Sequence, residues 1–573
     1  MRKKIVQIVS SLLVLLFLML TGAAALSNQY ANPRAAEVIR VGLYYGESAQ
    51  NAMTLSHYQG SGYQLGYYDT ANNFFPLAET SVPSVSVTRT WNMHYGTVER
   101  YPSYYMADTL TSDIMVGCYH IQQPGSYATY WEAEAAAMTQ PDGFVAYIDG
   151  VYYARFGSYP GRAAAQEALA SWGDGYTVGE TSSYGVNVVE TGTARILFQY
   201  DDLGRGTGLG ILPGSVMDSE AAVTWLQSGG SRNVYYGGFR FERIDGEDLV
   251  VINMIQLDDY VKGVIYREMS ASWELEALKA QAVCARTYGL YHMSRQKHGE
   301  FHFDLCTTTD CQVYDGVYIS GTADKIEKVN RAVDETSGQI MTVGGSPVEA
   351  LYYSSNGGAS EDSGNVWGAT LHLVGKEDPY EGTIEIPNYR WTVSYTGAEL
   401  QQKLIASGYT GCGVIERVEV SLTDNGNVYS LTFIDRSGKS YTRYKNSCRT
   451  FLTLRSLRYT VSGDGSTEIL GGETVSVNGN ERVGLNEGVY AISGDGSISM
   501  VTQGYIITEH GLEEIGRDAQ LSGSVATGST FTFSGSGYGH NVGMSQYGAY
   551  AMSLLGYTYL DILQFYYTGV TIG

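Results

Sequence analysis

The chain has 573 residues, which is too long for one hydrophobic core and predicts several domains. Its 59 acidic and 36 basic residues give a net charge of −23, which excludes nucleic acid as the expected partner because phosphate binding requires clustered Lys and Arg. The 70 Gly and 48 Tyr residues are typical of many turns and strands. We therefore expect a multidomain α+β protein with β-rich segments and a mixed region around a central amphipathic helix.

The first 27 residues have the pattern of an export signal. A basic start (MRKK) is followed by an apolar run through Leu20 and by small residues at 22–25. The apolar run is also close to the roughly 20 residues that span a membrane, so residues 1–27 are either a cleaved signal peptide or a retained membrane anchor. In both cases we expect an exported protein, secreted or anchored, that faces the cell wall from the extracytoplasmic side.

Two segments follow the signal. Residues 34–112 alternate short strands with turns and predict a β-rich N-terminal segment. Residues 113–192 predict the order of a ferredoxin-like α+β unit: strand 114–122, helix 126–138, strands 143–157, helix 161–172 and strand 185–190. Within it, YYARFGSY at 152–159 and RAAAQEA at 162–168 resemble the sporulation-related (SPOR-like) repeat. That resemblance implies a glycan-binding module, and an α+β domain without this role is the alternative.

The remaining chain divides into three further segments. Residues 193–461 combine strands with a helical block at 257–297. Residues 462–528 are rich in Gly and Ser, but their apolar residues recur with a period of two, so we expect a small β insertion. Residues 529–573 end in two helices, and a capping box at 558–561 predicts the start of the second.

Glu268 is the first candidate for chemistry. We expect a long amphipathic helix to begin at Ser272, a good N-cap, with Lys279 and Arg286 seven positions apart on a cationic side. Glu268 then lies just ahead of this helix. A single supported carboxyl group suits an enzyme that protonates a leaving group, and a solvated or capping Glu is the alternative.

A short segment with two cysteines is the second candidate. Cys306 and Cys311, with His302 just before them, have a spacing that suits Zn²⁺ held by three protein ligands. His298 is the alternative histidine. A Cys306–Cys311 disulfide and two free thiols are the alternatives to a metal.

A set of motifs in this chain resembles the stage II sporulation protein D (SpoIID/LytB) family. They follow the family's order and are YVKGV at 260–264, EM at 268–269, EALKAQA at 276–282, ARTY at 285–288, CQVY at 311–314, SSNGG at 354–358, VWG at 366–368, GYGHNVGMSQYGA at 537–549, GYTYLDIL at 556–563 and YYTG at 566–569. Asn541 stands where the family usually has Gly. Asn is the next most tolerant residue of a positive φ, so we expect the turn to be kept.

The resemblance implies a lytic transglycosylase that cleaves the bond between N-acetylmuramic acid (MurNAc) and N-acetylglucosamine (GlcNAc). Its substrate would be peptidoglycan glycan strands without stem peptides, in cell-wall remodelling linked to sporulation and engulfment. The family's catalytic acid falls on Glu268. This carboxyl group would protonate the glycosidic oxygen and then act as base toward the muramyl 6-hydroxyl, so that a 1,6-anhydro ring forms without a second carboxylate. Such an acid needs a raised pKa, so we expect an apolar, partly closed pocket.

The resemblance also implies further site residues and partners. We expect substrate contacts from Lys279, Arg286, Ser354, Ser355, Asn356, His540, Ser545 and Gln546, although turns satisfied by their own hydrogen bonds are the alternative. Family members with zinc near the catalytic Glu support a metal site at His302, Cys306 and Cys311. Other members stimulate a separate amidase. The alternative function is therefore a non-catalytic wall-binding protein that activates a partner amidase, together with other engulfment proteins.

Overall fold

The computed structural model describes residues 37–215, 222–319, 321–470 and 523–573, and short strands between 474 and 515. The predicted signal segment, 1–27, lies outside the described residues. Within the described ranges, no helix is both long and apolar enough to cross a bilayer. The chain divides into two compact units. Unit 1 contains the chain up to Ser272, residues 285–340 and Gly573, and unit 2 contains residues 273–284 and 341–572.

Two large sheets form most of unit 1. The seven-stranded sheet has the order β20 (Leu305–Cys306), β1 (Val38–Tyr44), β19 (Leu249–Gln256), β18 (Gly238–Arg243), β15 (Leu209–Pro213), β3 (Tyr63–Tyr68) and β4 (Phe74–Thr80). The ten-stranded sheet has the order β12 (Thr177–Gly179), β9 (Tyr119–Gln122), β11 (Val151–Tyr159), β10 (Gly143–Ile148), β14 (Ile196–Asp201), β13 (Val186–Glu190), β5 (Ser84–Arg89), β2 (Ala52–Gln59), β16 (Val223–Gln227) and β17 (Arg232–Tyr236). Both sheets combine strands from distant parts of the chain.

Helices and short elements complete unit 1. The helices are α2 (Tyr130–Ala137), α3 (Arg162–Leu169), α4 (Leu257–Glu268), α5 (Leu275–Met293, whose first half belongs to unit 2) and α6 (Ala323–Asp334). Three 3₁₀ turns are η2 (Gly46–Ser48), η3 (Ile244–Gly246) and η4 (Gly299–Phe301). A small sheet has the order β7 (Pro102–Met106), β6 (Met93–Thr97) and β8 (Met115–Val116).

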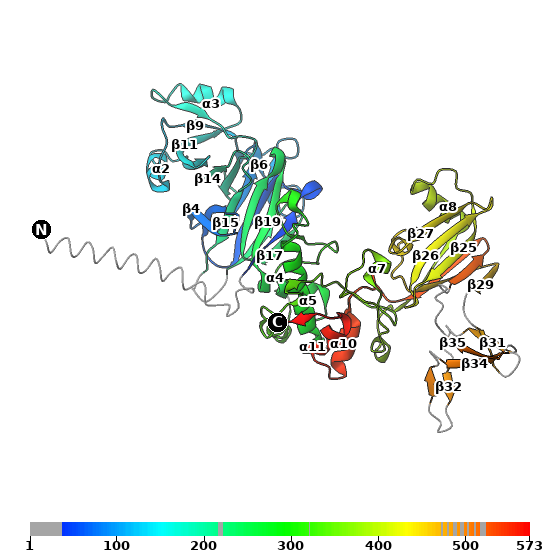
Figure 1. Cartoon of the computed structure of the whole chain (residues 1–573). Coiled ribbons are helices and arrows are strands. Elements are labelled where there is room, and N and C mark those ends of the chain that lie inside the picture. The colour runs from blue at the N-terminus through cyan, green and yellow to red at the C-terminus, as the bar shows by residue number, and fades with distance from the viewer. Residues whose placement is uncertain are drawn as a thin grey trace, which may run out of the picture. The chain divides into compact units, whose positions relative to one another are not determined.

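The α+β order predicted for residues 113–192 is present as β9, α2, β10, β11, α3 and β12. Ala137 of α2 and Leu169 of α3 pack with Ile121 and Phe156 in one cluster, so both helices cover the same face of these strands. Figure 1 shows both helices in cyan beside β11 and β9. The last strand differs from the expectation, because 177–179 rather than 185–190 pairs with β9. The SPOR-like resemblance and the domain boundaries stay predictions.

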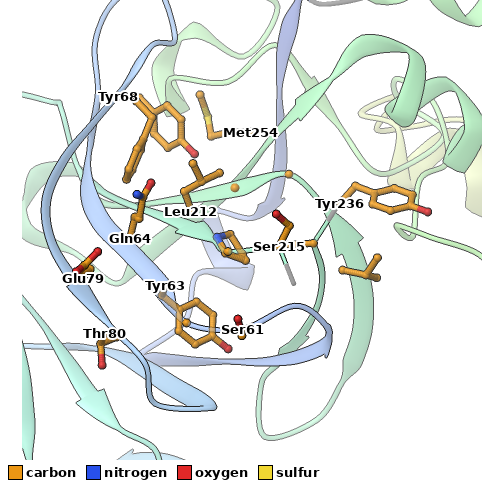
Figure 2. Close-up of a pocket in the computed structure, with 18 of the residues that line it drawn as sticks. Ser61, Tyr63, Gln64, Tyr68, Glu79, Thr80, Leu212, Ser215, Tyr236 and Met254 are labelled. Atoms are coloured by element: carbon orange, nitrogen blue, oxygen red, sulfur yellow. The ribbon is translucent and has the colours of Figure 1, made fainter. Parts of the chain in front are cut away.

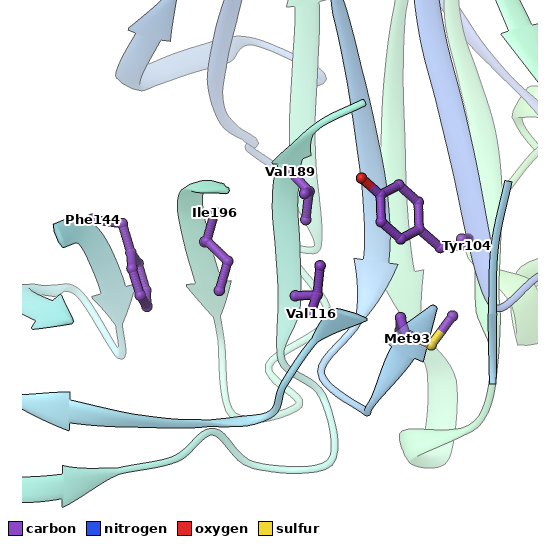
Figure 3. Close-up of a cluster of buried hydrophobic side chains, with 7 residues drawn as sticks. Met93, Tyr104, Val116, Phe144, Val189 and Ile196 are labelled. Carbon is purple, nitrogen blue, oxygen red and sulfur yellow. The ribbon is translucent and has the colours of Figure 1, made fainter. Parts of the chain in front are cut away.

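A buried cluster joins the small sheet of unit 1 to the ten-stranded sheet. Figure 3 shows Phe144, Ile196 and Val189 projecting from neighbouring strands toward Tyr104, Met93 and Val116 of the small sheet. Met93, Val116 and Val189 have no exposed surface. This contact packs the small sheet against part of the larger sheet and joins the predicted N-terminal β segment to the α+β region.

Unit 2 contains two larger sheets and several short elements. The five-stranded sheet has the order β27 (Ser440–Tyr444), β26 (Val428–Asp435), β25 (Ile415–Leu422), β36 (Gly523–Thr527) and β29 (Ser466–Leu470), and a three-stranded sheet has the order β24 (Arg390–Thr396), β37 (Thr530–Ser536) and β28 (Tyr459–Gly463). A second three-stranded sheet has the order β22 (Ser346–Pro347), β21 (Met341–Val343) and β39 (Thr571–Ile572). β23 (Tyr352–Tyr353) pairs with β38 (Met544–Ser545). Its helices are α7 (Ser363–Val366), α8 (Gly397–Ala406), α9 (Ser447–Thr450), α10 (Gln546–Leu554), α11 (Tyr559–Tyr566) and the 3₁₀ turn η5 (Glu381–Thr383). The predicted capping box of α11 is confirmed, since Thr558 and Asp561 each bond the other's backbone N–H.

The segment at 462–528, predicted as a small β insertion, is only partly separate from the sheets of unit 2. Its described part includes three antiparallel hairpins: β30 (Thr474–Val477) with β31 (Glu481–Gly484), β32 (Tyr490–Ile492) with β33 (Ile498–Met500), and β34 (Gly504–Thr508) with β35 (Gly511–Ile515). Both ends of the segment instead join the five-stranded sheet as β29 and β36. The protein is thus a multidomain α+β protein, as predicted.

The central helix α5 differs from the amphipathic helix that we expected. It begins at Leu275 rather than after Ser272, and residues 281–290 are all buried. Arg286 has no exposed surface, so the predicted cationic side does not form there. A helix that is enclosed on all sides belongs to the interior of its domain.

The cluster of Figure 3 gives a first testable prediction. Met93→Ala removes a side chain with no exposed surface and leaves a cavity, so we expect the free energy of unfolding to fall by about 2–5 kcal/mol. Trp91→Ala is the matched control, because Trp91 is 53% exposed and lies two residues away. Urea unfolding of both variants measures the difference, and equal stabilities would contradict the assignment of this core.

Candidate functional site

Glu268 is the last residue of helix α4, and its side chain is partly exposed. A carboxylate at the C-terminal end of a helix is disfavoured by the helix dipole. The backbone N–H of Val313 compensates by donating a hydrogen bond of 3.0 Å to Glu268 Oε1. The carboxyl group is therefore held in place by a loop that lies 45 residues later in the chain.

That loop also connects Glu268 to the two cysteines. Cys311 and Gln312 come directly before Val313, and the Tyr260 hydroxyl of α4 donates to Gln312 Oε1 at 3.1 Å. Burial raises the pKa of Tyr260 well above its usual range, and a negative charge on the nearby Cys311 or Glu268 would raise this pKa further. Tyr260 thus stays protonated, and its hydroxyl lies within electrostatic reach of both groups.

Four potential metal ligands gather beside this loop: His298, Cys306, Asp310 and Cys311. Their donor atoms all lie within 4.8 Å of one another. Cys311 Sγ lies 3.3 Å from His298 Nε2 and 3.8 Å from Asp310 Oδ2, and Asp310 Oδ2 lies 3.5 Å from His298 Nε2 and 4.0 Å from Cys306 Sγ. The ligands of a tetrahedral Zn²⁺ are about 3.3–3.8 Å apart, given its bond lengths of about 2.0–2.3 Å. The donor types suit zinc, and three of the four distances lie in this range, while the Asp310–Cys306 distance is slightly longer.

The predicted histidine is not part of this cluster. His302 caps the turn η4 with a left-handed φ of 60° and hydrogen-bonds Glu242 at 2.8 Å. His302 is therefore engaged with Glu242, and the histidine of the cluster is His298, the alternative of the sequence analysis. Asp310, which we did not predict, supplies a fourth group. Its signal in the sequence is its position directly before Cys311.

The two thiols of the cluster are chemically unequal. The Cys311 thiol donates to Cys306 and lowers the pKa of Cys306 to about 4. The same contact, together with burial, raises the pKa of Cys311. The pair therefore offers a thiolate, which is the form that binds metals. All six cysteines fall within the described residues and none forms a disulfide.

The two predicted cationic contacts have other roles. The Arg286 guanidinium has no exposed surface and pairs with Asp258 Oδ1 at 2.6 Å. It also donates to the carbonyls of Gln339 and Val333, so it holds helices together and is not placed to contact a sugar. Lys279 pairs with Glu276 at 2.9 Å and lies over the ring of Tyr559.

In unit 2, the SSNGG motif is organised by a buried carboxyl group that we did not predict. Glu381 Oε1 accepts from the backbone N–H of Asn356 at 2.7 Å, and Oε2 accepts from that of Gly357 at 3.1 Å. The hydroxyl of Ser545 also donates to Glu381. A second carboxylate, Asp378, accepts from Asn356 Nδ2 at 2.6 Å.

These bonds determine which predicted sugar-binding residues remain available. Four of the predicted residues are buried: Ser355, Asn356, Ser545 and Gln546. Ser355 and Asn356 belong to the turn, and Ser545 caps helix α10. Ser354 is partly exposed. Their position favours the alternative of a turn satisfied by its own bonds.

Among the predicted sugar-binding residues, His540 lies beside an exposed aromatic side chain. It lies between the rings of Tyr353 and Trp367, and Trp367 is 44% exposed. Burial and the charge of Arg449 lower the pKa of His540 to about 3, so the imidazole is neutral. The prediction for Asn541 is confirmed: it adopts a φ of 65° and donates to the carbonyl of Asn356.

Glu268 and the cysteine cluster belong to unit 1, whereas the SSNGG and GYGHN motifs belong to unit 2. A cleft shared by both groups stays a prediction. Within unit 1, the structure brings Glu268, Cys306 and Cys311 together through the single segment that ends at Val313.

Residues 245–343 match the family model described as SpoIID, Stage II sporulation protein. This region is therefore similar to the SpoIID family. The chain is 31% identical over 324 residues to the amidase enhancer of Bacillus subtilis, an alignment that covers 54% of this chain and 40% of that protein. It is also 27% identical over 333 residues to stage II sporulation protein D of B. subtilis, covering 56% of this chain and 75% of the relative. The chain thus aligns with less than half of the amidase enhancer.

The region matched to SpoIID, 245–343, includes helix α4 with Glu268 and the complete His298–Cys311 cluster. The carboxyl groups that hold the SSNGG motif lie beyond the matched residues. A further relative of 29% identity, an uncharacterized protein of Brachyspira hyodysenteriae, aligns over 59% of this chain and 72% of its own length.

The pKa of Glu381 predicts an unusual pH dependence. Burial, aided by the charge of Asp378, raises this pKa from 4.5 to about 7, even though the hydrogen bonds from Ser545 and the backbone act to lower it. Because the folded state then binds the proton more tightly, the contribution of Glu381 to stability is complete below pH 4.5 and is lost as the pH rises through about 7. The expected loss is roughly 2–4 kcal/mol.

We expect Glu381→Gln to flatten this decline in the melting temperature of unit 2 between pH 4.5 and 7.5, measured by scanning calorimetry. Glu399→Gln is the matched control, because bonds from Thr396 lower the pKa of Glu399 and keep it ionised throughout this range. If the melting temperature of Glu381→Gln falls with pH as steeply as that of wild type, the interpretation is wrong.

Proposed function

We propose that this protein is a peptidoglycan lytic transglycosylase that cleaves the MurNAc–GlcNAc bond of glycan strands from which stem peptides have been removed. The observation that carries the proposal is the position of Glu268 within the region matched to SpoIID, at the end of α4 and held by the N–H of Val313. Stage II sporulation protein D of B. subtilis is a relative, which supports a role in cell-wall remodelling during sporulation.

Glu268 carries the chemistry in this proposal. Its protonated carboxyl group gives a proton to the glycosidic oxygen as the bond to the anomeric carbon of MurNAc breaks. The resulting carboxylate then takes the proton of the muramyl 6-hydroxyl, whose oxygen bonds to that carbon and closes the 1,6-anhydro ring. No water is consumed, so one carboxyl group is sufficient, unlike the carboxylate pair of a hydrolysing glycosidase. This role requires export of the chain, in agreement with the predicted signal at 1–27.

The products of glycan strands test this proposal. We expect Glu268→Ala to lower the release of 1,6-anhydro products from denuded strands by about 10²–10⁴-fold, the usual contribution of a general acid. Mass spectrometry identifies these products, which are lighter by one water than hydrolysis products. Glu327→Ala is the matched control, because Glu327 is exposed on α6 and should leave the rate unchanged.

Two other results would change the conclusion. Products that retain the additional water would identify a hydrolase. Cleavage by neither wild type nor variant, with glycan binding retained, would favour the second candidate, a non-catalytic wall protein that activates an amidase. The similarity to the amidase enhancer of B. subtilis supports this second candidate.

We also propose that His298, Cys306 and Cys311 hold a zinc ion, with Asp310 as the fourth ligand. The gathering of four donor atoms of these types within 4.8 Å of one another supports this assignment. A bound zinc would fix the positions of its ligands by electrostatic attraction to thiolate, imidazole and carboxylate. The loop that continues from Cys311 to Val313 would thereby be held where it donates to Glu268.

Metal analysis distinguishes this ligand set from the one expected from the sequence. We expect about one zinc per chain in wild type and in His302→Ala, and loss of zinc in His298→Ala, Cys306→Ser and Cys311→Ser. Mass spectrometry of the metal in purified protein measures the ratio. A wild-type protein without zinc, or zinc lost in His302→Ala but kept in His298→Ala, would contradict the assignment.

A further inference from the structure

A groove of about 1310 Å³ opens in unit 1, lined by residues of β3, β4, β15, β18, β19, α2 and α4 (Figure 2). Neither Glu268 nor the cysteine cluster lines it. Small-molecule pockets have volumes of about 300–1,000 Å³, so the groove is large enough for an oligomer. Figure 2 shows Glu79 and Thr80 on one side of it and Tyr236 on the opposite side.

Aromatic side chains line part of the groove. Trp131 at the start of α2 is 64% exposed, and its ring meets the edge of Tyr130 at 5.3 Å between centroids. Phe74 of β4 is partly exposed and packs against Tyr68. Exposed rings of this kind offer apolar faces beside polar groups, which suits a ligand that has both C–H faces and hydroxyls, as a sugar does.

The floor of the groove has no side chain at Gly237 and Gly238. A Cβ at Gly238 would lie 2.0 Å from the hydroxyl of Tyr68, so only glycine fits there. Gly237 has a φ of 77° and would meet the carbonyl of Met254. The space that a side chain would fill at either position is already taken by protein atoms, so these two glycines allow close packing at this point of the groove wall.

The strands around the groove leave little backbone for a peptide to bind. β3, β15, β18 and β19 each have a strand on both sides in the seven-stranded sheet. β4 is the edge strand, but Pro76 lies in its middle and removes one N–H donor. Recognition therefore falls to side chains, which disfavours a peptide that binds by strand addition.

The charges of the groove are mainly negative. Glu79, Glu134 and Asp259 line it, and Lys262 is the one basic residue among its described lining residues. Lys262 is already paired with Asp259 at 3.4 Å and with Asp334 at 3.2 Å. Such a groove repels polyanions and favours neutral or cationic ligands.

Two of these carboxyl groups, Glu79 and Glu134, lie within electrostatic reach of one aromatic residue of the groove, Tyr130. Glu134 Oε1 accepts from the Tyr130 hydroxyl at 2.8 Å. Burial raises the pKa of Tyr130, and the hydrogen bond to Glu134 and the charges of Glu134 and Glu79 raise it further. Glu79 of strand β4 and Glu134 of helix α2 therefore both line the groove, and both act on Tyr130.

We propose that this groove binds glycan segments with free amino groups, that is, β-1,4-linked hexosamines without their N-acetyl groups. Trp131 and Phe74 pack against the sugar rings, and Glu79 and Glu134 pair with the ammonium groups. This site is distinct from Glu268 and goes beyond the proposed function, because it selects strands by their acetylation state.

Calorimetric titration of the purified chain tests the proposal with two probes, the tetramer of glucosamine and the tetramer of N-acetylglucosamine. We expect the glucosamine tetramer to bind at least ten times more tightly. Trp131→Ala and Glu79→Gln/Glu134→Gln should each weaken its binding at least tenfold. The matched controls are Trp91→Ala, at another exposed Trp, and Glu167→Gln on α3, which should bind as wild type does. If the double variant does not fold, the single variant Glu79→Gln replaces it in the titration, because Glu79 is exposed.

Three results would overturn the proposal. Wild type that binds neither tetramer has no such site. Equal binding of both tetramers, without any effect of Glu79→Gln, would show that the amino groups are not recognised. A tetralysine peptide that binds as tightly as the glucosamine tetramer would identify a peptide site. None of these results depends on glycan cleavage, so they are separate from a failure of the proposed function.

Discussion

A buried ion pair, Arg286 with Asp258, links helices α5 and α4 in the region matched to SpoIID. Arg286 lies on α5 and Asp258 near the start of α4, while the carbonyls of Val333 and Gln339 and the hydroxyl of Ser337 complete the network. A charge without exposed surface needs all of these partners, because unpaired burial would be strongly unfavourable. The network thereby orients α4, at whose far end Glu268 meets the loop from Cys311 to Val313.

Much of this arrangement could be predicted from local sequence. The capping box at Thr558, the α+β order of β9 to β12 and the left-handed turn at Asn541 each depend on a few adjacent residues, and the structure contains them. The sequence also predicted Glu268 just ahead of the central helix, and it does precede α5, although it is the last residue of a separate helix, α4. What failed was the environment of α5: its pattern of Lys, Arg and Ala resembles a surface helix, and the carbonyls that enclose Arg286 lie about 50 residues away.

The site residues that the sequence did not reveal act over long separations. Spacing alone could not decide between His298 and His302, because the choice depends on the left-handed turn at His302 and on Glu242, 60 residues earlier. Glu381 has no motif of its own, yet it holds the N–H groups of Asn356 and Gly357 and the hydroxyl of Ser545, 164 residues later. Motifs that suggested sugar contacts are therefore also motifs of internal architecture, and only the three-dimensional neighbours separate the two roles.

The ten-stranded sheet has a consequence for how the chain can be cut. β13, at 186–190, pairs with β14 on one side and with β5 on the other, and β14 continues to β10. A cut at 112 and 192 would leave β14 and β5 without the strand between them, and the excised piece would carry β13 without either partner. Unpaired edges of this kind invite association between chains. Residues 113–192 therefore cannot be transferred to another protein by themselves. A fusion would have to include β5 and β14 as well.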